Sequence, residues 1–268
     1  MQFKLDKKTY QNKLKSFKDK DSIKFHQYIT DLLEIKKSDK VLDLGCGHGH
    51  TLLYITQKLG KTGKVIGLDV GERLLAVAEK VLKNEVSEGK LELIKSDASK
   101  KLPFPDKSFN KIVCHNVIEC IPNKINFINE CHRILKKDGI LVMSHNDFDT
   151  QTYNSSYPDL SRKLVHTYCD TEQEWMETSD GMIGRKLYGI FHKTKFKKME
   201  ALTYVTTNTN FKPLEYGYSS AHNITDIAAK SKKFKSTELN KWLEDLKKKD
   251  KSGEYFYSIN IYIIVARK

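Results

Sequence analysis

The sequence predicts an α/β fold in which a doubly wound, mostly parallel sheet of seven strands is covered by helices on both faces. From residue 41 to 146, short apolar runs alternate with segments whose apolar residues have helical spacing. Glycines cluster where the first apolar run meets the first helical segment. After residue 146 the alternation stops, and we interpret the following segments as a substrate cap inserted into the sheet.

The expected elements follow from these patterns in chain order. Apolar residues recur every three or four positions over 22–35, which predicts a helix. Strand 41–44 is a short apolar run bounded by turn residues, and helix 50–59 ends at a glycine. The rest of the first half is predicted as strand 64–70, helix 71–86, strands 90–97 and 110–118, helix 123–139 and strand 139–145. Beyond it we expect turns and short helices over 147–180, helix 181–196, strand 198–211, helix 237–249 and strand 254–268.

The 268 residues are expected to form one domain, since the sequence has neither an internal repeat nor a long linker. Its expected parts are an N-terminal helical segment (1–38), a core (39–146), a cap with one helix (147–198), and C-terminal strands with a helix (199–268). No apolar run approaches the roughly 18 residues of a membrane span. Five cysteines without metal-type spacing indicate free thiols, a cytoplasmic location and no metal site.

The net charge of +13 lies mostly toward the ends of the chain. Residues 1–24 carry a net charge of +5 and residues 191–252 carry +7, whereas residues 25–190 are neutral overall. Nearly all of the excess is lysine, although arginine is the better residue for binding phosphates and base edges. We therefore interpret the lysines as a solvated surface, and a nucleic-acid partner is not expected.

The stretch VLDLGCGHGH, residues 41–50, contains three of the chain's 14 glycines. Glycine tolerates a positive φ and lets a ligand approach the backbone closely. The dinucleotide-binding pattern G-x-G-x-x-G is not matched, because the third glycine comes one position early and His50 takes its place. The observed spacing is instead Asp43-x-Gly45-x-Gly47-x-Gly49.

This spacing resembles that of the class I S-adenosylmethionine-dependent methyltransferases, which have a Rossmann-like fold. Asp69 and Asp97, at the ends of the next two predicted strands, and the stretches 102–120 and 132–144 resemble further landmarks of the family. The resemblance covers about residues 39–146 and is strongest to the ubiquinone/menaquinone-biosynthesis-like small-molecule enzymes, although Asn110 replaces the usual aspartate. It implies S-adenosylmethionine as the cofactor, bound by Tyr10, Asp43, Gly45, Cys46, Gly47, Asp69, Val70, Asp97, Ala98, His115 and Asn116.

Methyl transfer from a sulfonium needs positioning, exclusion of water, and a base where the acceptor arrives protonated. The candidate catalytic residues follow the fourth and fifth strands, where ligands of open α/β sheets bind: His115, His145, Asp147 and Asp149. Residues 147–180 carry a net charge of −6 with interleaved aromatic residues, a composition that suits a cationic acceptor. The predicted acceptor is a small-molecule amine. The alternatives are oxygen or sulfur acceptors, RNA held by the Lys-rich ends, and a non-catalytic S-adenosylmethionine-binding partner protein. The oligomeric state stays open.

Overall fold

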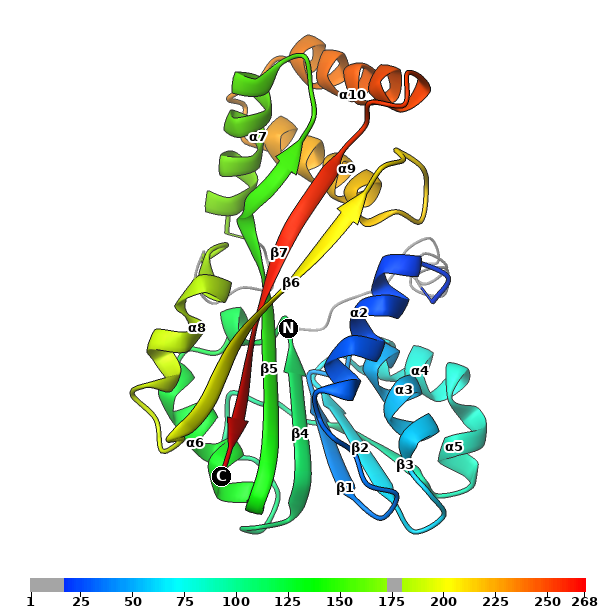
Figure 1. Ribbon diagram of the computed structural model, residues 1–268, viewed down its shortest axis with the longest axis vertical. Coiled ribbons are helices and arrows are strands. Elements are labelled where there is room, and N and C mark those ends of the chain that lie inside the picture. Colours follow the sequence, from blue (N-terminus) through cyan, green and yellow to red (C-terminus); the bar gives the residue numbers. More distant parts are fainter. Residues whose placement is uncertain (1–16, 173–179) are drawn as a thin grey trace.

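The computed structural model describes residues 17–172 and 180–268. Seven described strands form one sheet in the order β3-β2-β1-β4-β5-β7-β6 (Figure 1). Strands β1 to β5 are parallel to one another, β7 is antiparallel to β5, and β6 is antiparallel to β7. The bounds are β1 (Lys40–Leu44), β2 (Lys64–Asp69), β3 (Leu91–Lys95), β4 (Phe109–His115), β5 (Leu135–Tyr153), β6 (Lys198–Asn208) and β7 (Tyr257–Arg267). This topology confirms the predicted doubly wound, mostly parallel sheet.

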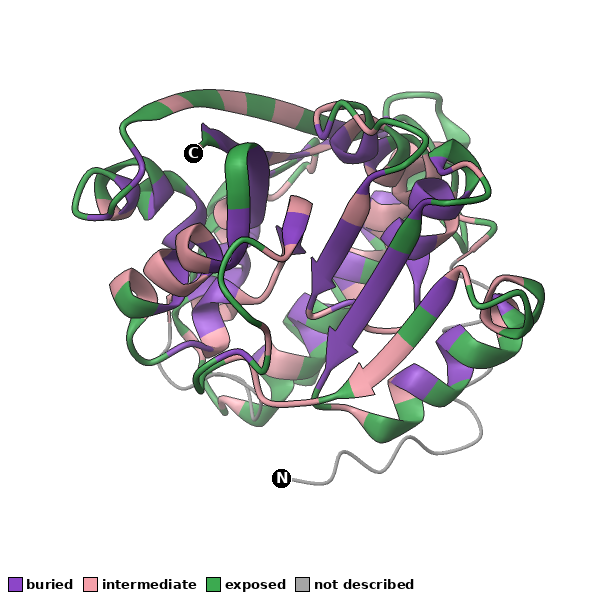
Figure 2. Ribbon diagram, turned by 90° about the horizontal axis from the view of Figure 1, so that it is seen from below, coloured by how far each residue is buried: buried purple, intermediate pink, exposed green. Residues whose placement is uncertain are grey.

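Helices cover both faces of the sheet. On one face the sheet shares a hydrophobic cluster with α2 (Lys20–Asp31), α3 (His50–Lys58) and α4 (Glu72–Val81). On the other face it shares a cluster with α6 (Lys124–Ile134) and α8 (Ile183–Phe191). Adjacent residues of β1, Val41 and Leu42, belong to opposite clusters, as expected for a strand buried on both faces. Figure 2 shows the central strands as almost continuously buried, while the helices alternate between buried and exposed residues.

The far ends of β5, β6 and β7 extend beyond the rest of the sheet (Figure 1). They carry a cap of three helices, α7 (Pro158–Asp170), α9 (Tyr216–Lys230) and α10 (Ser236–Lys251). The cap has its own hydrophobic cluster, in which Trp242 is fully buried and donates from Nε1 to Ser161 Oγ at 2.7 Å. The expected cap range 147–198 therefore contributes α7, while α8 covers the sheet and two cap helices come from the C-terminal range.

Three elements differ from the sequence-based expectation. The predicted helix 71–86 is interrupted at Leu82, whose φ of −109° and ψ of 35° separate α4 from α5 (Lys83–Ser87). The predicted helix 123–139 ends at Ile134, because Leu135 pairs with Phe109 and begins β5. Helix α9 is missing from the prediction, although Ala221, Ile224 and Ala228 have helical spacing and are fully buried.

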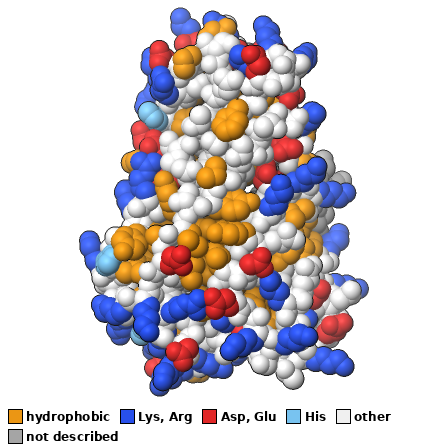
Figure 3. Space-filling view, viewed as in Figure 1, with side chains coloured by type: hydrophobic (Ala, Val, Ile, Leu, Met, Phe, Trp, Pro, Cys, Tyr) orange, Lys and Arg blue, Asp and Glu red, His pale blue; other side chains and the backbone are white. Residues whose placement is uncertain are grey.

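The distribution of charged side chains and the state of the cysteines agree with the expectations drawn from composition. On the face seen in Figure 3, Lys and Arg side chains are spread along the whole length of the molecule and interspersed with Asp and Glu. All five cysteines are free, and burial raises the pKa of Cys46 and Cys114. Among the helices that the structure describes, none combines the length and apolar character of a membrane-spanning segment.

Candidate active site

The glycine-rich turn joins β1 to α3 and passes over the end of β2. The amides of Gly45 and Cys46 both donate to the carbonyl of Leu68, at 2.7 and 3.0 Å. Gly45 has a φ of +71°, and a Cβ there would lie 2.2 Å from Cγ2 of Val117. Gly47 has a φ of +53°, but a Cβ there would meet no described heavy atom within 4 Å. Gly45 is therefore needed for packing, whereas Gly47 leaves open space above the backbone.

This open space belongs to a pocket of about 810 Å³. Its walls come from the carboxyl ends of β1, β2, β3 and β4, with His26 of α2 on another side. Ligands of open α/β sheets bind at this edge. Except for Tyr10, which lies outside the described residues, all predicted cofactor residues line the pocket: Asp43, Gly45, Cys46, Gly47, Asp69, Val70, Asp97, Ala98, His115 and Asn116.

Two buried carboxyl groups stand at the turn. Asp69 accepts from the amide of Gly47 at 2.8 Å and from the amide of Gly71 at 2.7 Å, so it ties the turn to the end of β2. Oδ2 of Asp43 is buried and has no hydrogen-bond partner in the part of the chain that the structure describes. Burial and the nearby Asp69 raise the pKa of Asp43 to about 8, and burial also raises the pKa of Asp69. A cationic ligand group would stabilise the ionised form of both carboxyl groups, because a buried carboxylate is costly without a partner.

Aromatic and imidazole rings gather where α2 meets the turn. Phe17 stacks on His50 with ring centroids 4.1 Å apart, and His26 stacks on the same imidazole at 5.0 Å. Phe25 lies 4.5 Å from His115 between ring centroids. His26, His48, His50 and His115 all line the pocket, and no Lys or Arg among the described residues does so. This end of the pocket is therefore formed mainly by flat rings.

The imidazole of His115 is held neutral. Its Nδ1 lies 2.9 Å from Oγ of Ser144, on the neighbouring strand β5. Burial first, and then the charge of His145, lower the pKa of His115 to about 3. Burial likewise lowers the pKa of His26, together with the neighbouring histidines. A neutral imidazole at a pocket wall can accept a hydrogen bond from a ligand's O–H group at physiological pH.

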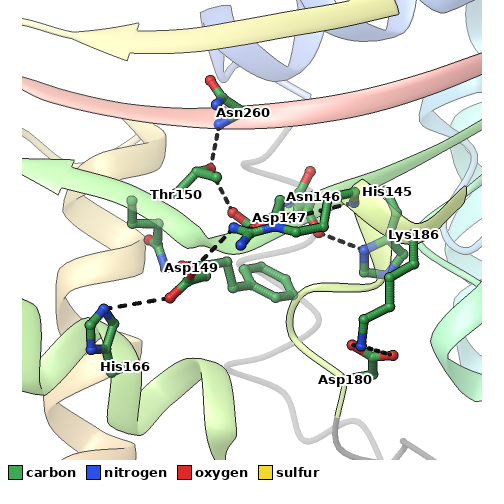
Figure 4. A network of polar contacts seen from close by, with 12 residues as sticks. His145, Asn146, Asp147, Asp149, Thr150, His166, Asp180, Lys186 and Asn260 are labelled. Atoms are coloured by element: carbon green, nitrogen blue, oxygen red, sulfur yellow. Dashed lines mark hydrogen bonds and ion pairs between the residues drawn. The ribbon is translucent and has the colours of Figure 1, made fainter. Parts of the chain in front are cut away.

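The other predicted catalytic residues do not line the pocket. Asp147 is fully buried, and its two carboxylate oxygens accept from Nε and Nη2 of Arg185, each at 2.6 Å. Nη2 of the same arginine also donates to Asp149 at 3.0 Å. Figure 4 shows both aspartates turned into this network, in which His166 of α7 lies 3.5 Å from Asp149. Since Arg185 pairs with both carboxylates and neither of them lines the pocket, the geometry gives no support to their predicted role in catalysis.

His145 is also buried away from the pocket wall. Its Nε2 contacts Oε2 of Glu119 in the short helical turn η1 (Ile118–Cys120), and its Nδ1 lies 2.6 Å from the carbonyl oxygen of Asn146. Both ring nitrogens are thus engaged within the protein. The predicted role of His145 as a catalytic base has no support from this geometry.

Replacing Arg185 by glutamine is expected to destabilise the fold by about 2–4 kcal/mol, because it leaves the buried carboxylate of Asp147 without a cation. The expected loss of stability is smaller than for a fully buried ion pair, since the Arg185 side chain is 40% exposed. Arg162→Gln is the control, because Arg162 pairs with Asp159 on the open surface of α7. Urea unfolding should separate the two variants by well over 1 kcal/mol, and equal midpoints would contradict the prediction.

Sequence reasoning missed the ring-lined end of the pocket. His26 comes from the helix before the sheet, His48 comes from the turn, and His50 is the first residue of α3. Two closely spaced histidines at a ligand-binding turn are a signal that the sequence offered. Across the described ranges, no group of three or more His, Cys, Asp or Glu has an arrangement suited to a metal ion.

Comparisons with known proteins identify the family and the fold of this chain. A family described as "Methyltransferase domain" matches residues 35–207. A demethylmenaquinone methyltransferase of Staphylococcus carnosus is 30% identical over 182 residues, which cover 64% of this chain and 73% of that protein. An uncharacterised transposon protein of Streptomyces fradiae is 24% identical over 91% of this chain, which spans only 66% of the relative's length. The crystal structure of YcgJ from Bacillus subtilis has a TM-score of 0.57 at 18% identity, covering 91% of this chain and 97% of that one, and shares the fold.

Proposed function

Since the chain belongs to the methyltransferase-domain family, we propose that it methylates a small aromatic acceptor with a weakly acidic O–H group, such as a phenol or hydroquinone. The observation that carries this proposal is the ring-lined end of the pocket, where His115 is a neutral imidazole beside Phe25. Flat rings favour a flat, apolar acceptor, and a neutral imidazole can accept a hydrogen bond from its O–H group.

The residues of the turn fit S-adenosylmethionine. This cofactor supplies an electrophilic methyl group on a positively charged sulfur. The space above Gly47 gives it room, and the buried carboxyls of Asp43 and Asp69 offer partners for its hydroxyl and cationic groups. Asp97 and Ala98, after β3, would hold the adenine, as the family resemblance implies. The ring-lined end beside α2 is then left for the acceptor.

The work of the chain in this reaction is positioning. When Nδ1–H of His115 donates to Ser144, Nε2 is the nitrogen left to accept a hydrogen bond from the acceptor's O–H group. This hydrogen bond orients the acceptor's oxygen and raises its electron density, and the O–H proton passes to water as the oxygen is methylated. The S. carnosus relative is named for a quinone-type substrate, which supports an acceptor of this class.

An amine acceptor, as the sequence predicts, has less support from the geometry. The prediction was based on the acidic residues 147–180, but Asp147 and Asp149 form ion pairs with Arg185. Of the described acids in that segment, only Glu172 lines the pocket. An amine therefore remains the second candidate, and its test is shared with the first.

The test measures binding and turnover separately. Calorimetry should detect S-adenosylmethionine and its demethylated product, but not NAD. Radiolabelled cofactor is then incubated with matched sets of phenols, hydroquinones, amines, thiols and RNA. Methylation confined to phenols or hydroquinones is expected. Methylation of amines alone would overturn the proposed acceptor, and failure to bind the cofactor would overturn the proposed function.

Binding of S-adenosylmethionine at pH 7 is expected to release a proton from Asp43. With a pKa of about 8, this carboxyl is mostly protonated before binding, and a cation entering the pocket lowers its pKa. Cofactor affinity should therefore rise with pH up to about 8 and then level off. Calorimetry in two buffers of different ionisation enthalpy measures the release. It should approach ~0.9 proton in the parent and fall in Asp43→Asn. Equal proton release by the parent and by Asp43→Asn would contradict the assignment of the released proton to Asp43.

A further inference from the structure

A buried chain of hydrogen bonds connects the pocket wall to the cap. Asn116, which lines the pocket with a φ of +51°, accepts at Oδ1 from the amide of Asn146, at 3.0 Å. Nδ2 of Asn146 donates to the hydroxyl of Tyr216 at 2.7 Å. Tyr216 is the first residue of α9, so Asn146 joins a pocket residue on one side to a cap helix on the other.

Asn146 is itself fixed by His145. Nδ1 of His145 lies 2.6 Å from the carbonyl oxygen of Asn146, and Nε2 contacts the carboxylate of Glu119. A carbonyl and a carboxylate only accept, so both ring nitrogens carry hydrogen and the ring is an imidazolium. Burial opposes the charged form of each partner, but the opposite charge outweighs it: the pKa of His145 is raised and that of Glu119 is lowered.

The position of Asn146 depends on this pair and on the pairing of β5 with β7, in which Asn146 lies opposite Ile261. Oδ1 of Asn146 is buried and has no hydrogen-bond partner within 17–172 and 180–268. Its side chain is therefore anchored through Nδ2, to Tyr216, while its backbone is held by the sheet and contacts His145 and Asn116. Without the imidazolium, the carbonyl of Asn146 would lose a strong charge-assisted bond.

We propose that Glu119 and His145 are a positioning pair that fixes Asn146, and thereby holds Asn116 at the pocket wall and the cap helix α9 in register above the acceptor. This inference rests on the proposed function, because it assigns the cap to the acceptor side of the same pocket. Neither Glu119 nor His145 lines the pocket, so they act through Asn146.

The charge of the pair is tested with Glu119→Gln, which keeps the size of the side chain and removes its charge. Glu130→Gln is the matched control, because Glu130 pairs with Arg133 on α6 instead. A ¹⁵N imidazole titration should show that His145 keeps both ring protons to a higher pH in the parent and in Glu130→Gln than in Glu119→Gln. Equal titration of His145 in the parent and in Glu119→Gln would overturn the proposal.

The positioning role is tested with Tyr216→Phe beside Glu119→Gln. Tyr255→Phe is the control, since the buried hydroxyl of Tyr255 has no hydrogen-bond partner among the described residues. Glu119→Gln and Tyr216→Phe should speed amide hydrogen exchange over residues 216–223, and neither control should do so. With the identified acceptor, both should raise its KM about tenfold, with smaller changes in kcat and cofactor affinity within about twofold.

Unchanged exchange over residues 216–223 in Glu119→Gln would refute the positioning role, even if His145 loses its proton. A wild-type protein that methylates no acceptor would refute the proposed function instead. The two failures are distinguishable, because the imidazole spectrum and the exchange measurement need no acceptor.

Discussion

Replacing Gly47 by valine is expected to abolish binding of S-adenosylmethionine in a protein that still folds. A Cβ at this position would meet no described heavy atom within 4 Å, so the protein itself has room for the side chain. The space that valine would fill belongs to the pocket at the end of β1. We expect calorimetry to show affinity weaker by at least about 100-fold, equivalent to ~2.7 kcal/mol.

Gly253→Val is the matched control for this variant. Gly253 has a φ of +73° and, like Gly47 with its φ of +53°, has open space where a Cβ would stand. Both valines would therefore incur a similar strain of about 1–2 kcal/mol from the left-handed backbone. Gly253 follows α10 and lies outside the pocket, so urea unfolding should rank the two variants together while calorimetry separates them. Cofactor binding by Gly47→Val with the parent's affinity would place the cofactor elsewhere.

The cofactor half of the site could be predicted from sequence because it depends on short-range features. A parallel strand, a glycine turn and a helix follow one another within 20 residues, and their backbone geometry fixes where Gly45 and Gly47 stand. Asp69 then reaches the turn because β2 lies beside β1 in register. The match to the methyltransferase-domain family confirms the class predicted from this spacing.

The acceptor half could not be predicted in the same way, because it depends on contacts between distant segments. The prediction that Asp147 and Asp149 follow the fifth strand was wrong, because β5 continues to Tyr153 and contains both. Arg185 arrives from α8, 38 residues beyond Asp147, and pairs with both carboxylates. The Glu119–His145 contact spans 26 residues and needs η1 to pack against β5. Such contacts depend on how elements pack, which alternation and spacing in a single sequence do not specify.

The cap also depends on contacts between distant segments, and for that reason its composition was not predicted from the sequence. Its hydrophobic cluster joins residues of α7 to residues of α9 and α10, which are separated in sequence by α8 and β6. A division of the chain into consecutive ranges cannot describe a cap assembled from two such segments. The long strands β5 and β7 bring the segments together, because they pair beyond the edge of the core, as at Tyr153 with Tyr257.

His115→Gln is expected to lower the turnover number for an O–H acceptor by about tenfold, because the hydrogen bond that orients the acceptor's O–H group is lost. Glutamine retains a polar group near Ser144 but does not place an acceptor atom where Nε2 of His115 lies. Cofactor affinity should change by less than tenfold, since the turn and its carboxyls remain in place. His132→Gln is the control, because His132 packs on Phe196 at α6, away from the pocket.

The pH dependence gives a second, independent readout for His115. Because its pKa in the folded protein is about 3, against an ordinary value of 6.5, the unfolded chain binds a proton at this residue between these pH values and the folded one does not. This residue's contribution to stability is therefore fully present above pH 6.5 and is lost progressively as the pH falls toward 3. Urea unfolding of His115→Gln should accordingly show a weaker loss of stability on acidification from pH 7 to 5 than the parent. Parallel stability curves, together with unchanged turnover, would show that His115 is neither buried as a neutral imidazole nor in contact with the acceptor.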